Sequence, residues 1–331
     1  MIGYLQHSRF RREAILKLGA ACLLASGLSG PVHANDAPVK LVVPFPPGGS
    51  TDIASRIIQP KLSELLGRTV IVENKPGAAT QIASQYVARS KPDGNTLLVS
   101  FDSHAINPIV RPDLPYDTFK DFRGIAFALR FPLVIAASPA TPGNNLKAFL
   151  QAAREQPGKF SYASTGAGSL NHLGIEDLKR RAKVDILHVP FGGGGPAVQA
   201  VLSNVVNFTT LSYAALKAHI ASGAVKPLAV TGTKRLADLP DTPTVEESGF
   251  PGYEAYSWIG IFAPAGTPED TAKTLTQAFQ KALSDKEVEA KLMDLGFEVV
   301  AEDGASADRY AREQFQRWDT FVKETGLSLK N

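Results

Sequence analysis

The sequence predicts an α/β protein of two domains, each with a mostly parallel sheet flanked by helices. Short apolar runs alternate with longer segments of helical periodicity, which is the pattern of repeated β-α-β units. The alternation restarts after Phe131-Pro132, a suitable crossing point into a second domain. The length of 331 residues also favours two domains, because each is then large enough to bury a core.

The first domain is expected to comprise residues 35–130 and 256–331. It begins with a strand over residues 40–43 and a helix over residues 52–66, which Pro60 should kink or split. Its other predicted strands cover residues 69–73, 96–101, 124–130 and 257–262. Its other predicted helices cover residues 81–90, 288–295 and 307–324, together with one that opens at a Thr267 cap.

The second domain is expected to comprise residues 131–255. Its predicted strands cover residues 133–137, 160–163, 186–189, 205–210 and 226–231. Its predicted helices cover residues 146–155, 170–182 and 196–203. The alternation of strand and helix again predicts parallel pairing within this part.

Residues 1–34 have the features of a cleavable secretory signal peptide. Three arginines and Lys17 form a basic start, residues 18–28 are apolar, and small residues precede a cleavage position after Ala34. The apolar run is shorter than the about 20 residues that a membrane span needs. We therefore expect a protein of the periplasm, exported by either the Sec or the twin-arginine route.

The mature chain is expected to be close to electrically neutral. The leader carries four of the 35 basic residues and one of the 32 acidic residues, which leaves 31 of each. This balance argues against a nucleic-acid-binding protein and against a basic membrane-surface protein. Cys22 is the single cysteine and lies in the leader, so the mature chain has no disulfide, thiol nucleophile or cysteine metal ligand.

A glycine-rich turn at residues 44–52 follows the first predicted strand and opens the first predicted helix. Gly48 and Gly49 let the backbone come close to a ligand, and N–H groups at the positive end of a helix favour a small anion. Ser50-Thr51-Asp52 matches neither a Walker phosphate loop nor a dinucleotide loop, so a nucleotide is not expected. The alternative is an ordinary strand-to-helix turn with Ser50 or Thr51 as N-cap.

Three more glycine-rich turns follow predicted strands, at residues 74–78, 164–169 and 191–196. Ligands of parallel α/β sheets bind outside the carboxyl ends of the strands, so all four loops are expected to face one interdomain cleft. Each turn alone is weak evidence, since ordinary turns are rich in glycine and proline. Four turns in equivalent positions indicate a binding site.

The order of motifs resembles a known family. Residues 40–52, the run Val-Glu-Asn-Lys-Pro-Gly-Ala at residues 72–78 and Ala-Ile-Asn-Pro at residues 105–108 are similar to the receptors of tripartite tricarboxylate transporters, also called Bug proteins. The resemblance extends over essentially the whole mature chain. Further matching segments are residues 114–117, 120–122, 164–172, 188–190, 228–231, 239–245, 247–249, 251–254 and 263–268.

The resemblance implies a periplasmic binding protein of the Venus-flytrap kind, similar to type II, whose two domains close over a small organic carboxylate. It also implies the membrane subunits of a tripartite transporter as partners. No cofactor and no metal are expected, and the receptor is expected to act as a monomer.

The chain departs from the family pattern near the expected ligand. Phe191-Gly192-Gly193 stands where relatives commonly have Tyr-Lys-Gly, and Ala200 stands where they often have aspartate. The usual glycines after Pro-Gly-Ala are replaced by Ala79 and Thr80, and residues 204–207 replace a Gly-Gln-Val-Asp run. We therefore expect one strongly recognised carboxylate with a comparatively apolar remainder, in preference to citrate or aspartate.

Ligand-binding residues are expected in the four loops and after the strand over residues 96–101. Backbone N–H groups and hydroxyls would hold the carboxylate without an arginine, and two phenylalanines would form apolar walls. The candidates are Phe45, Gly48, Gly49, Ser50, Thr51, Gly77, Ala78, Ser103, Thr165, Gly166, Ser169, Phe191 and Gly192. The serines and threonines alternatively cap helices, the phenylalanines alternatively pack in the core, and Asp52 is expected to accept N–H bonds from its own loop.

An enzyme is the less favoured alternative. His172 follows Ser169 by three residues, but the sequence has no Gly-x-Ser-x-Gly elbow, no His-Glu-x-x-His helix and no histidine pair with metal-ligand spacing. We expect no catalytic residues, and His172 is interpreted as a structural residue. An extracytoplasmic sensor that presents its ligand to a membrane signalling protein would share the same pocket, so this alternative stays open.

Overall fold

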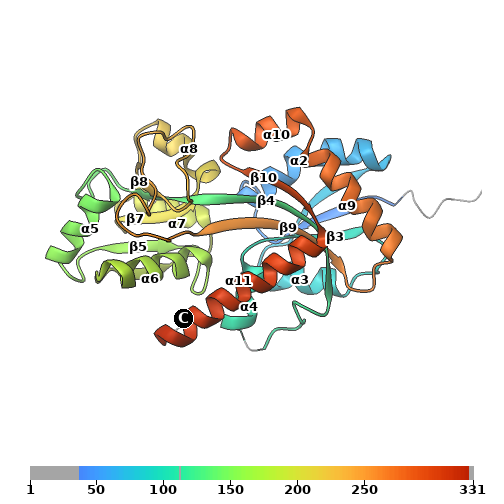
Figure 1. The fold of residues 1–331 in the computed structure, drawn as a ribbon, viewed down its shortest axis with the longest axis horizontal. Coiled ribbons are helices and arrows are strands. Elements are labelled where there is room, and N and C mark those ends of the chain that lie inside the picture. Colours follow the sequence, from blue (N-terminus) through green and yellow to red (C-terminus); the bar gives the residue numbers. More distant parts are fainter. Residues whose placement is uncertain (1–36, 112, 328–331) are drawn as a thin grey trace, which may run out of the picture. The chain divides into compact units, whose positions relative to one another are not determined.

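The computed structural model describes residues 37–111 and 113–327, in which ten strands form one continuous mixed sheet with helices on its faces (Figure 1). The strand order is β2-β1-β3-β9-β4-β7-β5-β6, and β10 and β8 also pair with β4. The predicted leader, residues 1–34, lies outside the described residues. Within the described residues, no helix combines the length and apolar character that crossing a membrane requires.

The first sheet region contains the three strands that precede β4 in the sequence, the first part of β4, and β9 and β10, which pair with it. Strands β1 (Val39–Val43), β2 (Val70–Asn74) and β3 (Thr96–Ser100) pair in parallel, as predicted. Strands β9 (Tyr256–Pro264) and β10 (Glu298–Asp303) pair antiparallel with the first part of β4 (Phe122–Ala137). Its helices are α2 (Ser50–Leu66), η1 (Ala78–Thr80), α3 (Gln81–Ala88), α4 (Ser103–Val110), α9 (Glu269–Leu283), α10 (Lys286–Met293) and α11 (Gly304–Thr325).

The second sheet region is built on the last part of β4. Strands β5 (Ser161–Ser164), β6 (Leu187–Pro190) and β7 (Phe208–Ser212) pair in parallel, and β7 and β8 (Lys226–Val230) pair antiparallel with β4. Its helices are α5 (Leu146–Glu155), α6 (Leu170–Ala182), α7 (Gly194–Leu202) and α8 (Tyr213–Ala221). Helices α5 and α6 have the predicted bounds.

Strand β4 connects the two sheet regions without a break. Residues 122–132 lie beside β9, and residues 133–137 lie beside β7 and β8. The prediction of two strands separated at Phe131-Pro132 is therefore wrong. Pro132, which has no N–H, stands where β4 changes partners, and the next N–H, that of Leu133, donates to Thr231 Oγ1 over 2.8 Å. Because β4 belongs to both regions, the domain boundaries at residues 130 and 256 stay a prediction.

Other differences from the predicted elements are local. Pro60 lies inside one uninterrupted helix α2, which ends at the left-handed Gly67. Thr267 is not the cap of α9: Pro268 holds that position, and the Thr267 hydroxyl donates to the Pro264 carbonyl. The sequence prediction missed α4, α8 and β10, which are short.

The core lies on the faces of the sheet beneath the helices. Phe131 at the centre of β4 is buried and packs against Phe101 and Phe297, with ring centroids 6.1 and 4.9 Å apart. Trp258 on β9 is also buried. The core fixes the strands, so the loops at their carboxyl ends are held at set positions.

Candidate functional site

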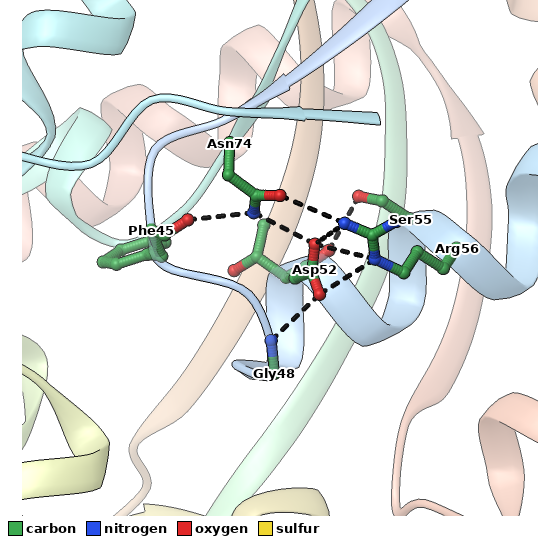
Figure 2. Close-up of polar contacts among 7 residues, drawn as sticks. Phe45, Gly48, Asp52, Ser55, Arg56 and Asn74 are labelled. Atoms are coloured by element: carbon green, nitrogen blue, oxygen red, sulfur yellow. Dashed lines mark hydrogen bonds and ion pairs between the residues drawn. The ribbon is translucent and has the colours of Figure 1, made fainter. Parts of the chain in front are cut away.

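The loop between β1 and α2 is closed by the carboxylate of Asp52 (Figure 2). The Gly48 N–H donates to Asp52 Oδ2 over 2.9 Å, and Arg56 Nε donates to both carboxylate oxygens. Asn74, the last residue of β2, donates from Nδ2 to Asp52 Oδ1 and to the Phe45 carbonyl, each over 3.0 Å. The prediction that Asp52 accepts an N–H bond from its own loop is confirmed.

The Asp52 carboxyl is ionised although it is buried. Burial alone would raise its pKa, but the hydrogen bonds from Arg56, Gly48 and Asn74 outweigh this effect and hold the pKa below the ordinary value of 3.8. Arg56 lies 2.9 Å from Asp52 and neutralises its charge. The loop is therefore held in one conformation and carries little net charge.

The first turn of α2 carries open backbone donors. Gly49 is the N-cap with an extended backbone, and its carbonyl accepts the Ile53 N–H. Over the ranges that the structure describes, the N–H groups of Ser50 and Thr51 have no acceptor, as is usual in the first turn of a helix. Neither side chain caps the helix, so the alternative of a Ser50 or Thr51 cap is wrong.

Ser50 is joined to the second sheet region by its hydroxyl. Ser50 Oγ and Ser212 Oγ lie 2.6 Å apart, and Ser212 is the last residue of β7 and the N-cap of α8. The sequence prediction missed Ser212, because it ended this strand at residue 210. The available signal was a serine at the carboxyl end of a strand, but the predicted strand ends two residues before Ser212.

In the loop after β2, the Lys75 ammonium group is paired with a carboxylate and an aromatic ring. Lys75 Nζ lies 2.6 Å from Glu73 Oε1 and 4.3 Å from the centre of the Tyr86 ring. Gly77 and Ala78, two of the predicted ligand residues, have φ angles of 129° and 46°. The φ of 129° at Gly77 lies in a region that L side chains rarely adopt, so this position favours glycine.

Ser103 begins helix α4 directly after β3. Its Oγ accepts a hydrogen bond from Thr80 Oγ1 over 3.0 Å. The other end of α4 contacts the second sheet region, since a Cβ on Gly168 would lie 2.7 Å from Val110 Cγ1. Helix α4 therefore lies beside two of the predicted loops.

The loop after β5 uses its predicted donors internally. Thr165 Oγ1 donates to Asn171 Oδ1 over 2.7 Å, and the Gly166 N–H donates to Ser164 Oγ over 3.1 Å. Ser169 Oγ donates to the Gly166 carbonyl over 2.7 Å, and Ser169 caps α6 by accepting the His172 N–H. The alternative of Ser169 as a helix cap is therefore confirmed.

Two histidines contact the loop after β5 through hydrogen bonds. The rings of His172 and His188 are stacked with centroids 3.9 Å apart, and burial lowers the pKa of each to about 4. His172 Nδ1 accepts the Gly168 N–H over 3.0 Å, so its ring holds the loop. His188 Nε2 lies 2.6 Å from Ser164 Oγ, but Ser164 is fully buried and its oxygen already accepts the Gly166 N–H, so this pair has no access to a substrate.

The two predicted aromatic walls differ in their surroundings. Phe45 packs edge-on against Phe101, with ring centroids 5.3 Å apart. Phe191 packs partly against the apolar cluster of the second sheet region, and its N–H donates to the Ser164 carbonyl. Gly192 is exposed, and a Cβ there would meet nothing within 4 Å. Within the described residues no group of histidine, cysteine, aspartate and glutamate side chains is arranged to hold a metal ion.

The structure brings the predicted residues together in pairs of loops. Asn74 joins the loop at residues 44–52 to the loop at residues 74–78, and the Phe191 N–H joins the loop at residues 164–169 to the loop at residues 191–196. Ser50 of the first sheet region contacts Ser212 of the second. Ser103 accepts a hydrogen bond from Thr80, which lies two residues after the loop at residues 74–78. The contacts therefore connect strand ends of both sheet regions.

A mixed sheet with helices on its faces and with glycine-rich loops at its strand ends is the architecture of periplasmic binding proteins. The solved structure of the periplasmic binding protein BugD is similar, with a TM-score of 0.81 and 33% identity over 88% of this chain and 98% of that one. The chain belongs to the tripartite tricarboxylate transporter family of receptors, whose model matches residues 54–327.

Other relatives are similar over nearly their full lengths. Protein BugT of Bordetella pertussis is 32% identical over 313 residues, which cover 93% of this chain and 96% of BugT. The R. palustris protein Rpa4515, solved with adipate, is 32% identical with a TM-score of 0.84 and covers 88% of this chain and 98% of its own. MatC from Rhodopseudomonas palustris, solved with bound malate, is 32% identical with a TM-score of 0.79, over 88% of this chain and all of MatC.

Proposed function

We propose that this chain is a periplasmic receptor that captures a small organic carboxylate and delivers it to the membrane subunits of a tripartite tricarboxylate-type transporter. The observation that carries the proposal is the first turn of α2. There the open N–H groups of Ser50 and Thr51 lie beside the paired hydroxyls of Ser50 and Ser212. This places donors at the positive end of a helix dipole, a setting that favours a carboxylate.

The available donors are sufficient for a useful affinity. A hydrogen bond to a charged group contributes about 1.5–3 kcal/mol, and a helix N-terminus adds up to about 2 kcal/mol. Micromolar binding requires about 8 kcal/mol net. Three or four such bonds, some made through ordered water, offset the desolvation of one carboxylate without an arginine.

The proposed ligand has one strongly held carboxylate and an apolar remainder. Phe45 and Phe191 supply apolar surface, and the exposed Gly192 supplies no side chain to recognise a second charge. Of the acids bound to the two related receptors, adipate has the longer apolar chain, so we expect adipate to bind more tightly than malate. Short aliphatic and aromatic monocarboxylates fit the proposed class most fully, because adipate and malate each carry a second carboxylate.

The proposal includes the route and the role of the chain. Residues 1–34 act as a signal peptide that is removed after Ala34, and the mature receptor acts as a monomer without a cofactor. We propose no catalytic residue, since Ser169 serves as a helix cap and the buried Ser164 and the partly buried His188 support a loop.

Titration of the purified mature protein tests this function. Adipate, malate, citrate, aspartate, benzoate and butyrate are compared by thermal shift and then by calorimetry. An acid at 100 times its dissociation constant should add about 2.7 kcal/mol to the free energy of unfolding and so raise the melting temperature. Absence of any shift across the panel would contradict carboxylate capture. Tighter binding of citrate or aspartate than of both monocarboxylates would contradict only the proposed selectivity.

A further inference from the structure

Residues 77–80 adopt an unusual backbone. Gly77, Ala78, Ala79 and Thr80 have consecutive φ angles of 129°, 46°, 49° and 76°. Only glycine adopts such angles without strain, and a β-branched threonine there is a clear outlier. Residues 78–80 therefore have the positive φ angles typical of glycine, although their alanine and threonine side chains disfavour them.

A buried asparagine holds the strained segment in place. Asn107 Nδ2 on α4 donates to the Ala79 carbonyl over 2.9 Å and to Thr80 Oγ1 over 3.2 Å. Because a carbonyl oxygen only accepts hydrogen bonds, the Asn107 group that faces Ala79 must be the NH₂ group. Asn107 and Thr80 are both buried, with 3% and 5% of their surfaces exposed.

The direction of these hydrogen bonds determines the orientation of a third group. Thr80 Oγ1 accepts from Asn107 and donates its own proton to Ser103 Oγ over 3.0 Å. Ser103 therefore accepts from Thr80, so its hydroxyl proton points elsewhere. Among the described residues this proton has no acceptor, and Ser103 is only partly buried.

We propose that Thr80 and Asn107 are positioning residues that orient the Ser103 hydroxyl as a donor to the carboxylate of the ligand. The inference rests on the proposed function and identifies a specific donor within that site. Asn107 donates to Thr80, and Thr80 donates to Ser103. The Ser103 hydroxyl at the end of this chain of hydrogen bonds is therefore a donor, which suits an anionic acceptor. A neutral or cationic group gains less from such a donor. The strained backbone at Thr80 is maintained because it places the threonine hydroxyl between the other two.

Four variants of the mature receptor test the inference, with whichever of the six panel acids (adipate, malate, citrate, aspartate, benzoate and butyrate) binds the wild type most tightly. Ser103→Ala removes the donor and should weaken binding about tenfold. Thr80→Val keeps the side-chain shape and should weaken binding at least threefold, whereas Thr80→Ser keeps the hydroxyl and should bind like the wild type. Thr118→Val is the matched control. Thr118 is equally buried, and its hydroxyl has no partner in the described chain, so affinity should not change.

A double variant separates positioning from a purely structural role. If Thr80 acts through Ser103, Thr80→Val should cause no further loss of affinity in the Ser103→Ala background. An equal loss in both backgrounds, or wild-type affinity in Thr80→Val, would overturn the inference while leaving the proposed function intact. Unchanged affinity in Ser103→Ala would also overturn it. Failure of the wild type to bind any acid of the six-acid panel would instead reject the proposed function, and the inference with it.

Discussion

At the scale of single residues, Gly49 is the most direct test of backbone recognition. Its φ of −80° suits any residue, and a Cβ there would lie 3.9 Å from the Pro46 carbonyl oxygen, an ordinary contact. Gly166 is a poorer choice, because its φ of 135° makes every substitution strained.

We predict that Gly49→Leu weakens adipate binding at least about tenfold with little change in melting temperature, because its side chain blocks N–H donors that each contribute about 1.5–3 kcal/mol. Lys75→Ala should change affinity less than about threefold, since the Lys75 ammonium group already pairs with Glu73. Calorimetric titration of both variants checks this. Loss of binding in Lys75→Ala with normal binding in Gly49→Leu would assign recognition to the cation instead.

At the scale of elements, the carboxylate of Asp52 joins β1, β2 and α2. Its side chain is only 3% exposed and accepts from Gly48, Arg56 and Asn74. Removal of the carboxylate would leave the Gly48 N–H without its acceptor and would take one of their acceptors from Arg56 and Asn74, which keep their other contacts. The expected cost is about 2–4 kcal/mol, because the buried, charged carboxylate holds the loop to β2 and α2 through hydrogen bonds that each contribute about 1.5–3 kcal/mol.

The prediction is that Asp52→Ala lowers the free energy of unfolding by about this amount and also weakens carboxylate binding. Asp319→Ala is the matched control, since Asp319 also pairs with a basic residue four positions further along its helix, but the partner Lys323 is 73% exposed. The control should lose less than about 1 kcal/mol. Urea denaturation of both variants measures the difference, and equal losses would contradict the structural role of Asp52.

At the scale of the whole molecule, buried titratable groups determine how stability depends on pH. Burial lowers the pKa of His104 to about 3 and the pKa of His172 and His188 to about 4, below the ordinary 6.5. Unfolding lets these rings take up protons, so the free energy of unfolding falls as the pH decreases from 6.5 towards 4. Burial raises the pKa of Asp102 from 3.8 to about 8, despite hydrogen bonds from Ser257 and Trp258 that lower it.

Asp102 has the opposite effect on stability. Its proton is retained in the folded state and released on unfolding between pH 3.8 and 8, so the free energy of unfolding falls as the pH rises through this window. Three histidines outweigh one aspartate below pH 6.5, whereas Asp102 dominates above it. We predict maximum stability near pH 6.5.

Urea denaturation between pH 4.5 and 8.5 checks the prediction. Asp102→Asn should remove most of the decline between pH 6.5 and 8, because the amide does not titrate. A wild-type stability that increases steadily to pH 8 would show that Asp102 is ionised in the folded protein.

Several parts of the candidate site were predictable from short stretches of sequence. The strand, glycines and helix around Gly48 predicted the turn that opens α2, and Asp52 was correctly expected to accept from its own loop. The bounds of α6 were also predicted, because its Ser169 cap and apolar spacing are local signals. The residues that contact a ligand stay a prediction. Strand ends have weaker local signals in the sequence. The predicted strand over residues 205–210 ends before Ser212, so the prediction missed this residue.

The sequence by itself determined the class of protein, because its periodicity, loop motifs and family resemblance are carried by neighbouring residues. Only the tertiary structure decided which polar groups meet. Ser50 and Ser212 are 162 positions apart, and Thr80 and Asn107 are 27 apart. Which donor meets which acceptor depends on strand order and helix packing, and on the continuity of β4 through Pro132. Short-range propensity does not specify those long-range contacts, because they form only when the whole sheet buries its core.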